Sequence, residues 1–192
     1  KERAETGRIY IMNIDHCNTH SSFKDKIYMS NLCQEITLPT TPIKHIDDPD
    51  GEIALCILSA INLGLIKEKD ELKDLCDLSV RALEEIIDYQ EYPVEAAKKS
   101  TLARRSLGIG YIGLAHFLAK NKVKYDDKEA WKLVDEITEA FQYYLLKASN
   151  TLAKERGACE YFDKTKYSDG ILPIDSYKKD VDDIVNRKLS YD

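Results

Sequence analysis

The sequence has no long apolar run and no excess of basic residues. None of its apolar stretches approaches the roughly 18–20 residues that a helix needs to cross a bilayer, and we expect no signal peptide in its first residues. Its 34 Asp and Glu outnumber its 28 Lys and Arg, which gives a net charge of −6. Because a polynucleotide-coating surface needs clustered Lys and Arg, this charge disfavours it. Membrane, secreted and nucleic-acid-binding proteins are therefore disfavoured.

Cysteine is scarce and irregularly spaced. The chain has 5 cysteines, an odd number, without a CxxC pair or a repeated Cys/His ladder. A disulfide scaffold and a structural zinc site therefore have little support, and we expect reduced thiols in a cytoplasmic protein. Each thiol is then either a small buried hydrophobe or a chemically used group. The five are Cys17, Cys33, Cys56, Cys76 and Cys159.

The first third of the chain has extended or loop character. The 192 residues, 43% of them apolar, are enough for one domain with a sizeable core. Alternating side chains predict a strand over Arg8–Met12, and Asn31–Leu38 is predicted to be extended. We expect loops over 21–30 and 39–51, and the apolar stretch Ile53–Leu65 fits either a strand or a helix.

From Asp70 onwards, apolar residues recur at the spacing of helices. Gly157 is well placed to end the longest of these helices. The sequence therefore predicts two or three strands followed by four or five helices, which is too few strands for a closed sheet. The predicted helices cover 70–89, a region around 95–103, 107–120, 127–156 and a short acidic stretch near 174–185.

One short run combines three reactive side chains. In an extended chain, Asn31, Cys33 and Glu35 share one face and span roughly 13 Å, because alternate residues point to the same side. A thiol between an amide and a carboxylate is suited to several atoms of one small polar ligand. From alternation alone, the alternative stays open that Cys33 only packs in a half-buried strand.

This run also carries a resemblance to a known family. Residues Ser30–Thr40 (SNLCQEITLPT) resemble the active-site loop of the large subunit of class I ribonucleoside-diphosphate reductase. Further motifs similar to that family follow its order over essentially the whole chain. They are Thr6–His20, Gly51–Cys56, Asn62–Gly64, Asp88–Gln90, Arg104–Gly110, Gln142–Lys147 and Gly170–Asp175.

The resemblance implies a fold and a place within it. We expect an α/β fold, part of a ten-stranded α/β barrel whose active-site cysteine sits on a central loop. Residues 1–192 would be the central segment of that catalytic barrel domain, without its N-terminal regulatory and C-terminal parts. On this view the isolated chain is inactive and needs the remaining segments of the large subunit.

The resemblance also implies residue roles in the reduction of ribonucleoside diphosphates to deoxyribonucleoside diphosphates. Cys33 matches the thiol that becomes a thiyl radical and abstracts the 3′ hydrogen, and Glu35 matches the base for the 3′-hydroxyl proton. Asn31 matches the amide that binds the ribose hydroxyls and helps to hold the carboxylate. Cys56 matches one member of the redox-active thiol pair. The substrate-binding run is Asn31, Leu32, Cys33, Gln34 and Glu35.

Partners and cofactors follow from the same resemblance. Partners would be the ribonucleoside diphosphate, a small radical-generating subunit with a di-iron centre, and thioredoxin or glutaredoxin as reductant. We expect no cofactor on this segment, and effectors of the ATP and dATP type would bind elsewhere in the full subunit. No metal site is expected, because the His16–His20 run (HCNTH) is better explained as a polar turn than as a set of ligands.

Three other features are predicted to be structural. Gly108–Gly113 (GIGYIG) has the letters of a dinucleotide fingerprint but lacks the expected context, so close helix packing explains its glycines better. Cys76 and Cys159 are predicted to pack rather than react. Trp131 lies in a strongly periodic helix, where core or rim packing explains it, together with Tyr143 and Tyr144.

Two hypotheses from other classes remain at the level of sequence. A thiol hydrolase would use Cys33 as its nucleophile with His16 or His20 as base. A non-catalytic fragment would bind complementary reductase segments and leave Cys33 inert. Deoxynucleotide formation that depends on Cys33 separates both hypotheses from the reductase.

Overall fold

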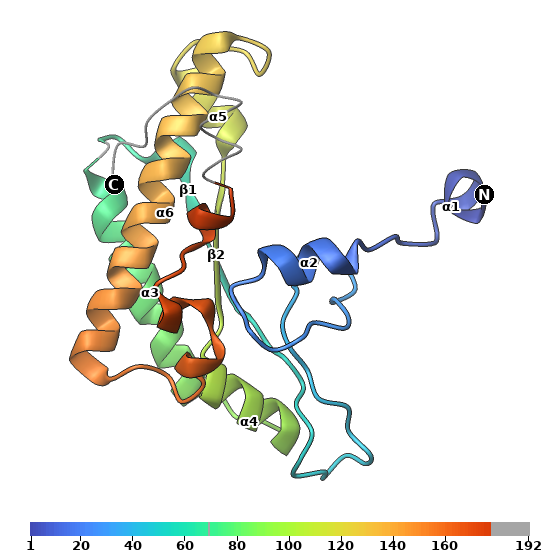
Figure 1. Cartoon of the computed structure of the whole chain (residues 1–192). Coiled ribbons are helices and arrows are strands. Elements are labelled where there is room, and N and C mark those ends of the chain that lie inside the picture. Colours follow the sequence, from blue (N-terminus) through green and yellow to red (C-terminus); the bar gives the residue numbers. More distant parts are fainter. Residues whose placement is uncertain (69, 178–192) are drawn as a thin grey trace.

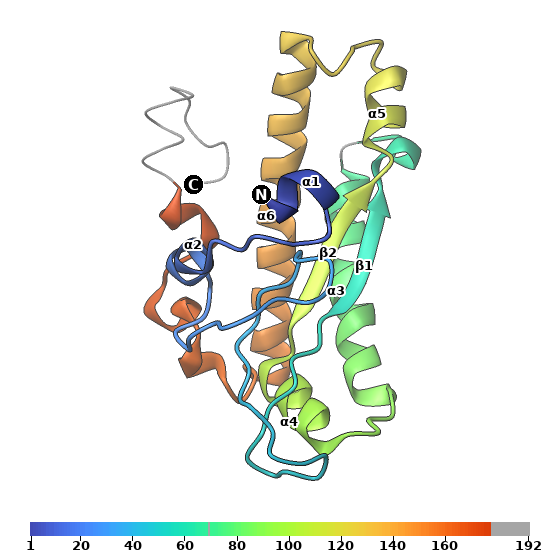
Figure 2. The same cartoon turned by 90° about the vertical axis from the view of Figure 1, so that its right-hand side faces the viewer.

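The computed structural model describes residues 1–68 and 70–177. Two parts are apparent. One is a frame of two strands and two long helices, β1, β2, α3 and α6, which we call the frame (Figure 1). The other is residues 21–52, which we call the loop segment. It lies across the sheet from α3 and α6 (Figures 1 and 2).

The frame is built around a parallel strand pair. Strand β1 (Ile57–Asn62) pairs with β2 (Leu107–Ile112), in a register that runs from Ile57 opposite Leu107 to Asn62 opposite Ile112. Parallel strands need a long crossover between them. Here the crossover contains α3 (Glu71–Tyr89) and α4 (Glu95–Arg104), so the unit is a β–α–α–β connection.

Apolar stripes on two helices bury one face of this sheet. Helix α6 (Lys128–Arg156) packs along α3, and both contribute to a core shared with the strands. The stripe spacing that predicted these helices places their apolar side chains on the inner faces. The buried residues of this core are Ile61, Leu63, Leu72, Cys76, Ile137, Ala140 and Phe141.

The remaining elements of the described chain are short. The loop segment has no helix or named strand. One isolated antiparallel bridge, Phe23 with Thr165, joins it to the chain after α6, and a second, Thr41 with Glu52, lies within the loop segment itself. Short helices flank the two main parts. They are α1 (Glu2–Thr6), α2 (Ile14–His20), α5 (Leu114–Lys120) and the 3-10 turns η1 (Leu63–Leu65), η2 (Phe162–Lys164), η3 (Lys166–Asp169) and η4 (Pro173–Ser176).

Three predicted helices are confirmed. The predictions over 70–89, 95–103 and 127–156 correspond to α3, α4 and α6 within a residue or two. Gly157 directly follows α6 with a φ of 94°, a backbone conformation that favours glycine. The open choice over Ile53–Leu65 resolves into β1 followed by η1.

One predicted strand and one predicted helix were wrong. Arg8–Met12 forms no strand: Tyr10 and Ile11 are exposed, and no neighbouring strand in the described part of the chain pairs with this stretch. The predicted helix over 107–120 is β2 followed by α5, separated by Gly113 at a φ of 74°. Ile109 and Tyr111 pack on the frame core, so burial on alternate positions prevails over the helical spacing.

The mixture of a parallel strand pair with covering helices confirms the α/β class. Within residues 1–68 and 70–177, the helices are all too short or too polar to cross a membrane. The predicted acidic helix near 174–185 lies mostly outside the described residues. Its first residues belong to η4.

Candidate active site

The run with the three reactive side chains forms a tight loop. The Asn31 N–H donates to the Ile36 carbonyl at 3.4 Å, and the Ser30 hydroxyl donates to the same oxygen at 2.7 Å. Inside this closure, the Gln34 N–H donates to the Asn31 carbonyl at 3.1 Å. The chain from Ser30 to Ile36 therefore reverses direction, with Leu32 and Cys33 in the turn.

The Asn31 side chain bonds to this loop through both the oxygen and the nitrogen of its amide. Its Oδ1 accepts from the Ile36 N–H at 3.1 Å, and its Nδ2 donates to Glu35 Oε1 at 2.6 Å. The second bond is short because its acceptor is a carboxylate. One asparagine thus fixes both the backbone of the loop and the position of the only acid in it.

The predicted extended conformation of Asn31–Leu38 was wrong at its start. Gln34 has a φ of 64°, so the backbone turns there and the side chains no longer alternate. Asn side chains bond to nearby backbone and thereby compete with extended structure. The amide and the carboxylate still meet, but they meet by direct hydrogen bonding and not by sharing the face of a strand.

Cys33 and Leu32 are exposed at the turn, and Leu32 keeps 83% of its surface accessible. An exposed thiol two residues from a positioned carboxylate can meet a ligand that a packed thiol cannot. Glu35 is also exposed, so its carboxylate is accessible to a proton donor on the same ligand. The loop therefore offers an exposed thiol and an exposed carboxylate two residues apart in the sequence.

Cys56 lies in different surroundings, one residue before β1. It is a free, half-buried thiol, and burial raises its pKa above the ordinary value. Its sulfur lies against Gly108 of β2, where an added Cβ would come within 2.9 Å of Sγ. Gly108 thus leaves the space that the thiol occupies. The described residues hold Cys33 and Cys56 in separate elements, and both are free thiols.

The glycine pattern at Gly108–Gly113 has another explanation than the predicted helix packing, which was wrong. Gly108 and Gly110 lie in β2, and Gly113 precedes α5. A Cβ at Gly113 would come within 2.3 Å of the Asn62 amide oxygen. Gly108 and Gly113 thus permit close approach between the strands and their neighbours, whereas a Cβ at Gly110 would meet nothing within 4 Å.

The His16–His20 run is helical and not the predicted turn. It forms most of α2, in which His16 lies 3.9 Å from Asp15 and His20 stacks on Tyr177 at 4.9 Å. In the described part of the chain, no three His, Cys, Asp or Glu side chains are arranged to hold a metal ion. Nor does a hydrogen bond join Cys33 to either histidine among these residues, so the thiol–base pair of a hydrolase is not formed there.

The remaining sequence candidates occupy packing positions. Cys76 is fully buried in the frame core, which confirms its predicted role, and burial raises its pKa to about 11. Cys159 is half-buried, and burial raises its pKa as well. Trp131 is 59% exposed and donates its indole N–H to the Tyr125 carbonyl, so it belongs to the rim and not to the core.

Sequence reasoning missed one buried charge near the loop. Arg104, the last residue of α4, is only 8% exposed and pairs with Glu52 and Asp25. The signal was present in the motif Arg104–Gly110, but a charged residue next to exposed lysines gave no indication of burial.

Comparisons with known proteins identify relatives of this chain. A family model described as the ribonucleotide reductase barrel domain matches residues 1–190. The chain is 61% identical over 195 residues to ribonucleoside-diphosphate reductase subunit alpha of Haemophilus influenzae, covering 100% of this chain and 26% of that protein. It is 60% identical over 192 residues to the subunit alpha of Buchnera aphidicola subsp. Schizaphis graminum, covering 98% and 25%.

A third relative gives the same result. Ribonucleoside-diphosphate reductase 1 subunit alpha of Escherichia coli is 57% identical over 195 residues, covering 100% of this chain and 26% of that protein. The chain therefore spans about a quarter of the length of the curated relatives that it matches.

Proposed function

The chain belongs to the ribonucleotide reductase barrel-domain family, and from this premise we propose that it forms the catalytic centre of a class I large subunit. The reaction is the reduction of a ribonucleoside diphosphate to the deoxyribonucleoside diphosphate. In this proposal, β1 and β2 are two neighbouring strands of a ten-stranded barrel, completed by the remaining segments of the subunit. The Cys33 loop would lie in the centre of that barrel, in the cytoplasm.

The Cys33 sulfur would open the reaction as a thiyl radical. It takes the 3′ hydrogen atom of the ribose, so that an S–H bond forms, the C3′–H bond breaks and the radical moves to C3′. At the end the hydrogen atom returns to the sugar, and the thiyl radical is regenerated. The exposed position of Cys33 at the turn supports this role, because the sulfur must reach a bound sugar.

Glu35 would act as the general base for the 3′-hydroxyl proton. The observation that carries the proposal is the 2.6 Å hydrogen bond from the Asn31 amide to the Glu35 carboxylate, two residues from the thiol. It leaves one carboxylate oxygen for the substrate while fixing the orientation of the other. Leu32 and Gln34 complete the run that would surround the ribose.

Cys56 would supply reducing equivalents together with a second thiol outside this chain. Replacement of the 2′-hydroxyl by hydrogen breaks the C2′–O bond, forms a C2′–H bond, releases water and consumes two protons and two electrons. Oxidation of two thiols to one disulfide releases the same number. Thioredoxin or glutaredoxin would then reduce the disulfide. The half-buried thiol with a raised pKa is consistent with storage as the neutral S–H form.

The radical is expected from a small partner subunit with a di-iron centre, which supplies the oxidising equivalent for Cys33. Effectors of the ATP and dATP type would bind elsewhere in the full large subunit. In this proposal, the chain contributes the side chains that face the substrate.

The test uses the complete subunit that contains this sequence, mixed with its radical subunit and a dithiol. We expect deoxynucleotide from a ribonucleoside diphosphate with the wild type, and background levels with Cys33→Ser. Cys17→Ser is the matched control, because Cys17 is a half-buried thiol on α2, and it should retain wild-type turnover. Activity in Cys33→Ser would contradict the radical role. Inactive wild-type protein in the complete mixture would favour a non-catalytic fragment.

A further inference from the structure

A buried arginine of α4 forms ion pairs with the loop segment. The Arg104 side chain is 4% exposed, and its Nη2 donates to Glu52 and to Asp25, each at 3.0 Å. The guanidinium also stacks over the ring of Tyr161, 5.0 Å from its centroid. Its Nε and Nη1 have no hydrogen-bond partner among the described residues. Arg104 is therefore attached to the loop segment through a single nitrogen.

The two carboxylates come from opposite sides of the Cys33 loop. Asp25 lies five residues before Ser30, on the chain that enters the loop. Glu52 pairs with Thr41, on the chain that leaves it: each donates its N–H to the other's carbonyl, at 3.2 and 2.9 Å, and the Thr41 hydroxyl donates to Glu52 Oε2 at 3.3 Å. Arg104 thus connects both ends of the loop to α4.

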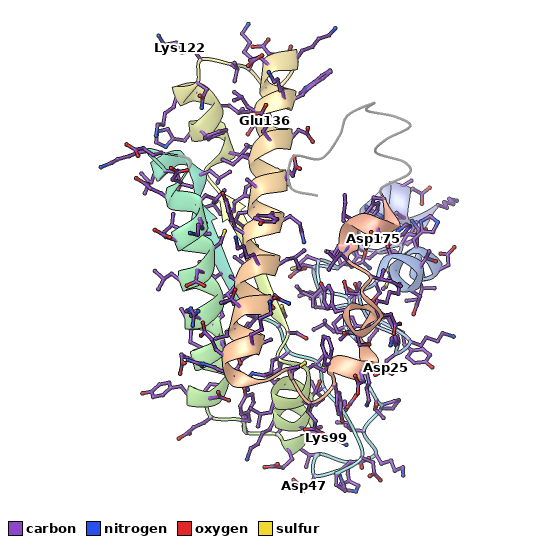
Figure 3. The ribbon with its side chains drawn as sticks, turned by 60° about the vertical axis from the view of Figure 1, so that its left-hand side comes forward. Asp25, Asp47, Lys99, Lys122, Glu136 and Asp175 are labelled. Carbon is purple, nitrogen blue, oxygen red and sulfur yellow. The ribbon has the colours of Figure 1, made fainter. Side chains whose placement is uncertain are left out.

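A polar cavity of about 390 Å³ marks the place where these two ends meet. Tyr28 lines it from the entering chain and Thr40 from the leaving chain. Asp25 and Lys99 of α4 line the same cavity and lie at the same end of the molecule (Figure 3). Charged and polar side chains therefore face each other where the two ends meet, next to the buried Ile27 and Pro39 of the same two stretches.

Burial makes this connection restrictive. The side chain of Glu52 is 7% exposed and that of Asp25 is 37% exposed. Separation of a buried ion pair leaves an uncompensated charge in the interior, which is strongly unfavourable. The two ends of the loop cannot move apart unless the guanidinium becomes exposed or loses a carboxylate partner, so the spacing of the two ends is fixed.

We propose that Arg104 is a positioning residue for the reduction: through Asp25 and Glu52 it sets the spacing of the two ends of the Cys33 loop and so the place of the thiol over the ribose. This inference rests on the proposed function. Abstraction of a hydrogen atom requires the reacting atoms within about 3–3.5 Å, and a displacement of 1 Å lowers a rate by roughly 100-fold. Arg104 itself touches no substrate in this proposal.

The main test is Asp25→Asn in the complete subunit, assayed with the radical subunit and dithiol. This change removes one charge at a half-exposed site and leaves the buried Arg104–Glu52 pair intact. We expect kcat to fall about ten-fold, with KM for the ribonucleoside diphosphate and the thermal midpoint nearly unchanged. A purely structural role would lower the thermal midpoint and leave kcat per folded protein as it was.

Two substitutions of Arg104 provide a rescue test. Because only one nitrogen of Arg104 bonds to the carboxylates, Lys can replace the charge and that donor, whereas Met can replace neither. We expect Arg104→Lys to keep kcat within about ten-fold of the wild type and Arg104→Met to lose more. Arg104→Met leaves Glu52 buried and unpaired, so the fold of this variant is checked first by circular dichroism. If Arg104→Met is unfolded, the kcat of Asp25→Asn alone decides whether Arg104 positions the loop.

The matched control is Glu155→Gln, which breaks the ion pair of Arg81 and Glu155 between α3 and α6. The exposure of its side chain, 47%, is similar to that of Asp25, but it lies away from the Cys33 loop. It should keep the wild-type kcat. The positioning role would be overturned if Asp25→Asn and Arg104→Lys both kept the wild-type kcat and Arg104→Met had the same kcat as Arg104→Lys. It would also be overturned if Glu155→Gln lost as much kcat as Asp25→Asn. A wild type without Cys33-dependent reduction would instead overturn the proposed function.

Discussion

The frame and the loop segment place their cysteines by different forces. In the frame, Leu72, Cys76 and Ile87 have no exposed surface, and apolar burial between α3, α6 and the strands holds the structure. The loop segment buries Ile27 and Pro39 but has no regular secondary structure, and around Cys33 it is held by hydrogen bonds of Asn31 and, further out, by ion pairs of Arg104. Cys33 lies in the second region, and Cys56 lies at the start of the first.

This difference matches the tasks that we propose for the two thiols. A group that meets a polar sugar must be exposed, and apolar packing cannot position an exposed side chain. Directed hydrogen bonds can, because they fix angle as well as distance. A thiol that only stores reducing equivalents tolerates burial, which keeps it protonated. The comparison predicts that substitutions in the loop segment change catalysis and that those in the frame change stability.

The largest expected effect concerns catalysis in the loop segment. Glu35→Gln should lower kcat by roughly 10²–10⁴-fold, because an amide cannot accept the 3′-hydroxyl proton. Its carbonyl oxygen can still accept from Asn31, so the thermal midpoint should stay that of the wild type. Steady-state kinetics of the complete subunit check this, with Glu68→Gln as an exposed acidic control. Wild-type kcat in Glu35→Gln would contradict the assignment of the base.

The next effect compares two leucines. Leu72→Ala removes a fully buried side chain of the frame and should lower the free energy of local unfolding by about 2–5 kcal/mol. Leu32→Ala, at a residue 83% exposed in the loop, should leave it unchanged. Amide hydrogen exchange of α3 and α6 in the complete subunit measures both. Equal protection in the two variants would remove the distinction between the regions.

A third, smaller effect tests the packing around the Cys56 thiol. At Gly108 a Cβ would lie 2.5 Å from Leu58 Cδ2 and 2.9 Å from Cys56 Sγ, so Gly108→Ala must displace the thiol, at a cost of about 1–3 kcal/mol. Dithiol-driven turnover should fall and the rate of Cys56 alkylation should change. Gly110→Ala is the control in the same strand, because a Cβ there meets nothing within 4 Å. Identical alkylation rates would show that Gly108 does not shape the site of Cys56.

The smallest effect is a pH dependence inside the frame. Burial raises the pKa of Cys76 from 9.0 to about 11, so the folded state holds this proton more tightly than the unfolded state. The contribution to stability is complete below pH 9 and is lost as the pH rises towards 11, which amounts to about 1 kcal/mol at pH 10. Urea midpoints at pH 8 and pH 10 should differ more for the wild type than for Cys76→Ala. The same pH response in both proteins would contradict this contribution of Cys76 to stability.

The sequence predicted those parts that depend on local repetition. Helices α3 and α6 repeat an apolar stripe over many turns, so their extents were predicted closely. The strand β2 was mistaken for helix because six residues give little periodicity, and its pairing with β1 depends on residues fifty positions away. Long-range pairing is not visible in a local pattern.

The candidate site likewise has features that a local sequence pattern indicates and features that depend on distant residues. The residue types at Asn31, Cys33 and Glu35 left a packing role for Cys33 open, and the chemistry that we propose for them came from the resemblance to a family. The shape of their loop was not predicted, since it depends on which backbone groups one asparagine side chain reaches. Arg104 was missed because its burial results from partners on two other segments.

The distance in sequence between Arg104 and its partners sets an order of events during synthesis. Asp25 and Glu52 precede Arg104 by 79 and 52 residues. At about 5–20 residues per second, a ribosome makes Asp25 roughly 4–16 seconds before the arginine that anchors it. Throughout that interval the chain on both sides of the Cys33 loop lacks its ion pairs with Arg104. Cys33 thus reaches its final geometry only after α4 is complete, although its loop is synthesised earlier.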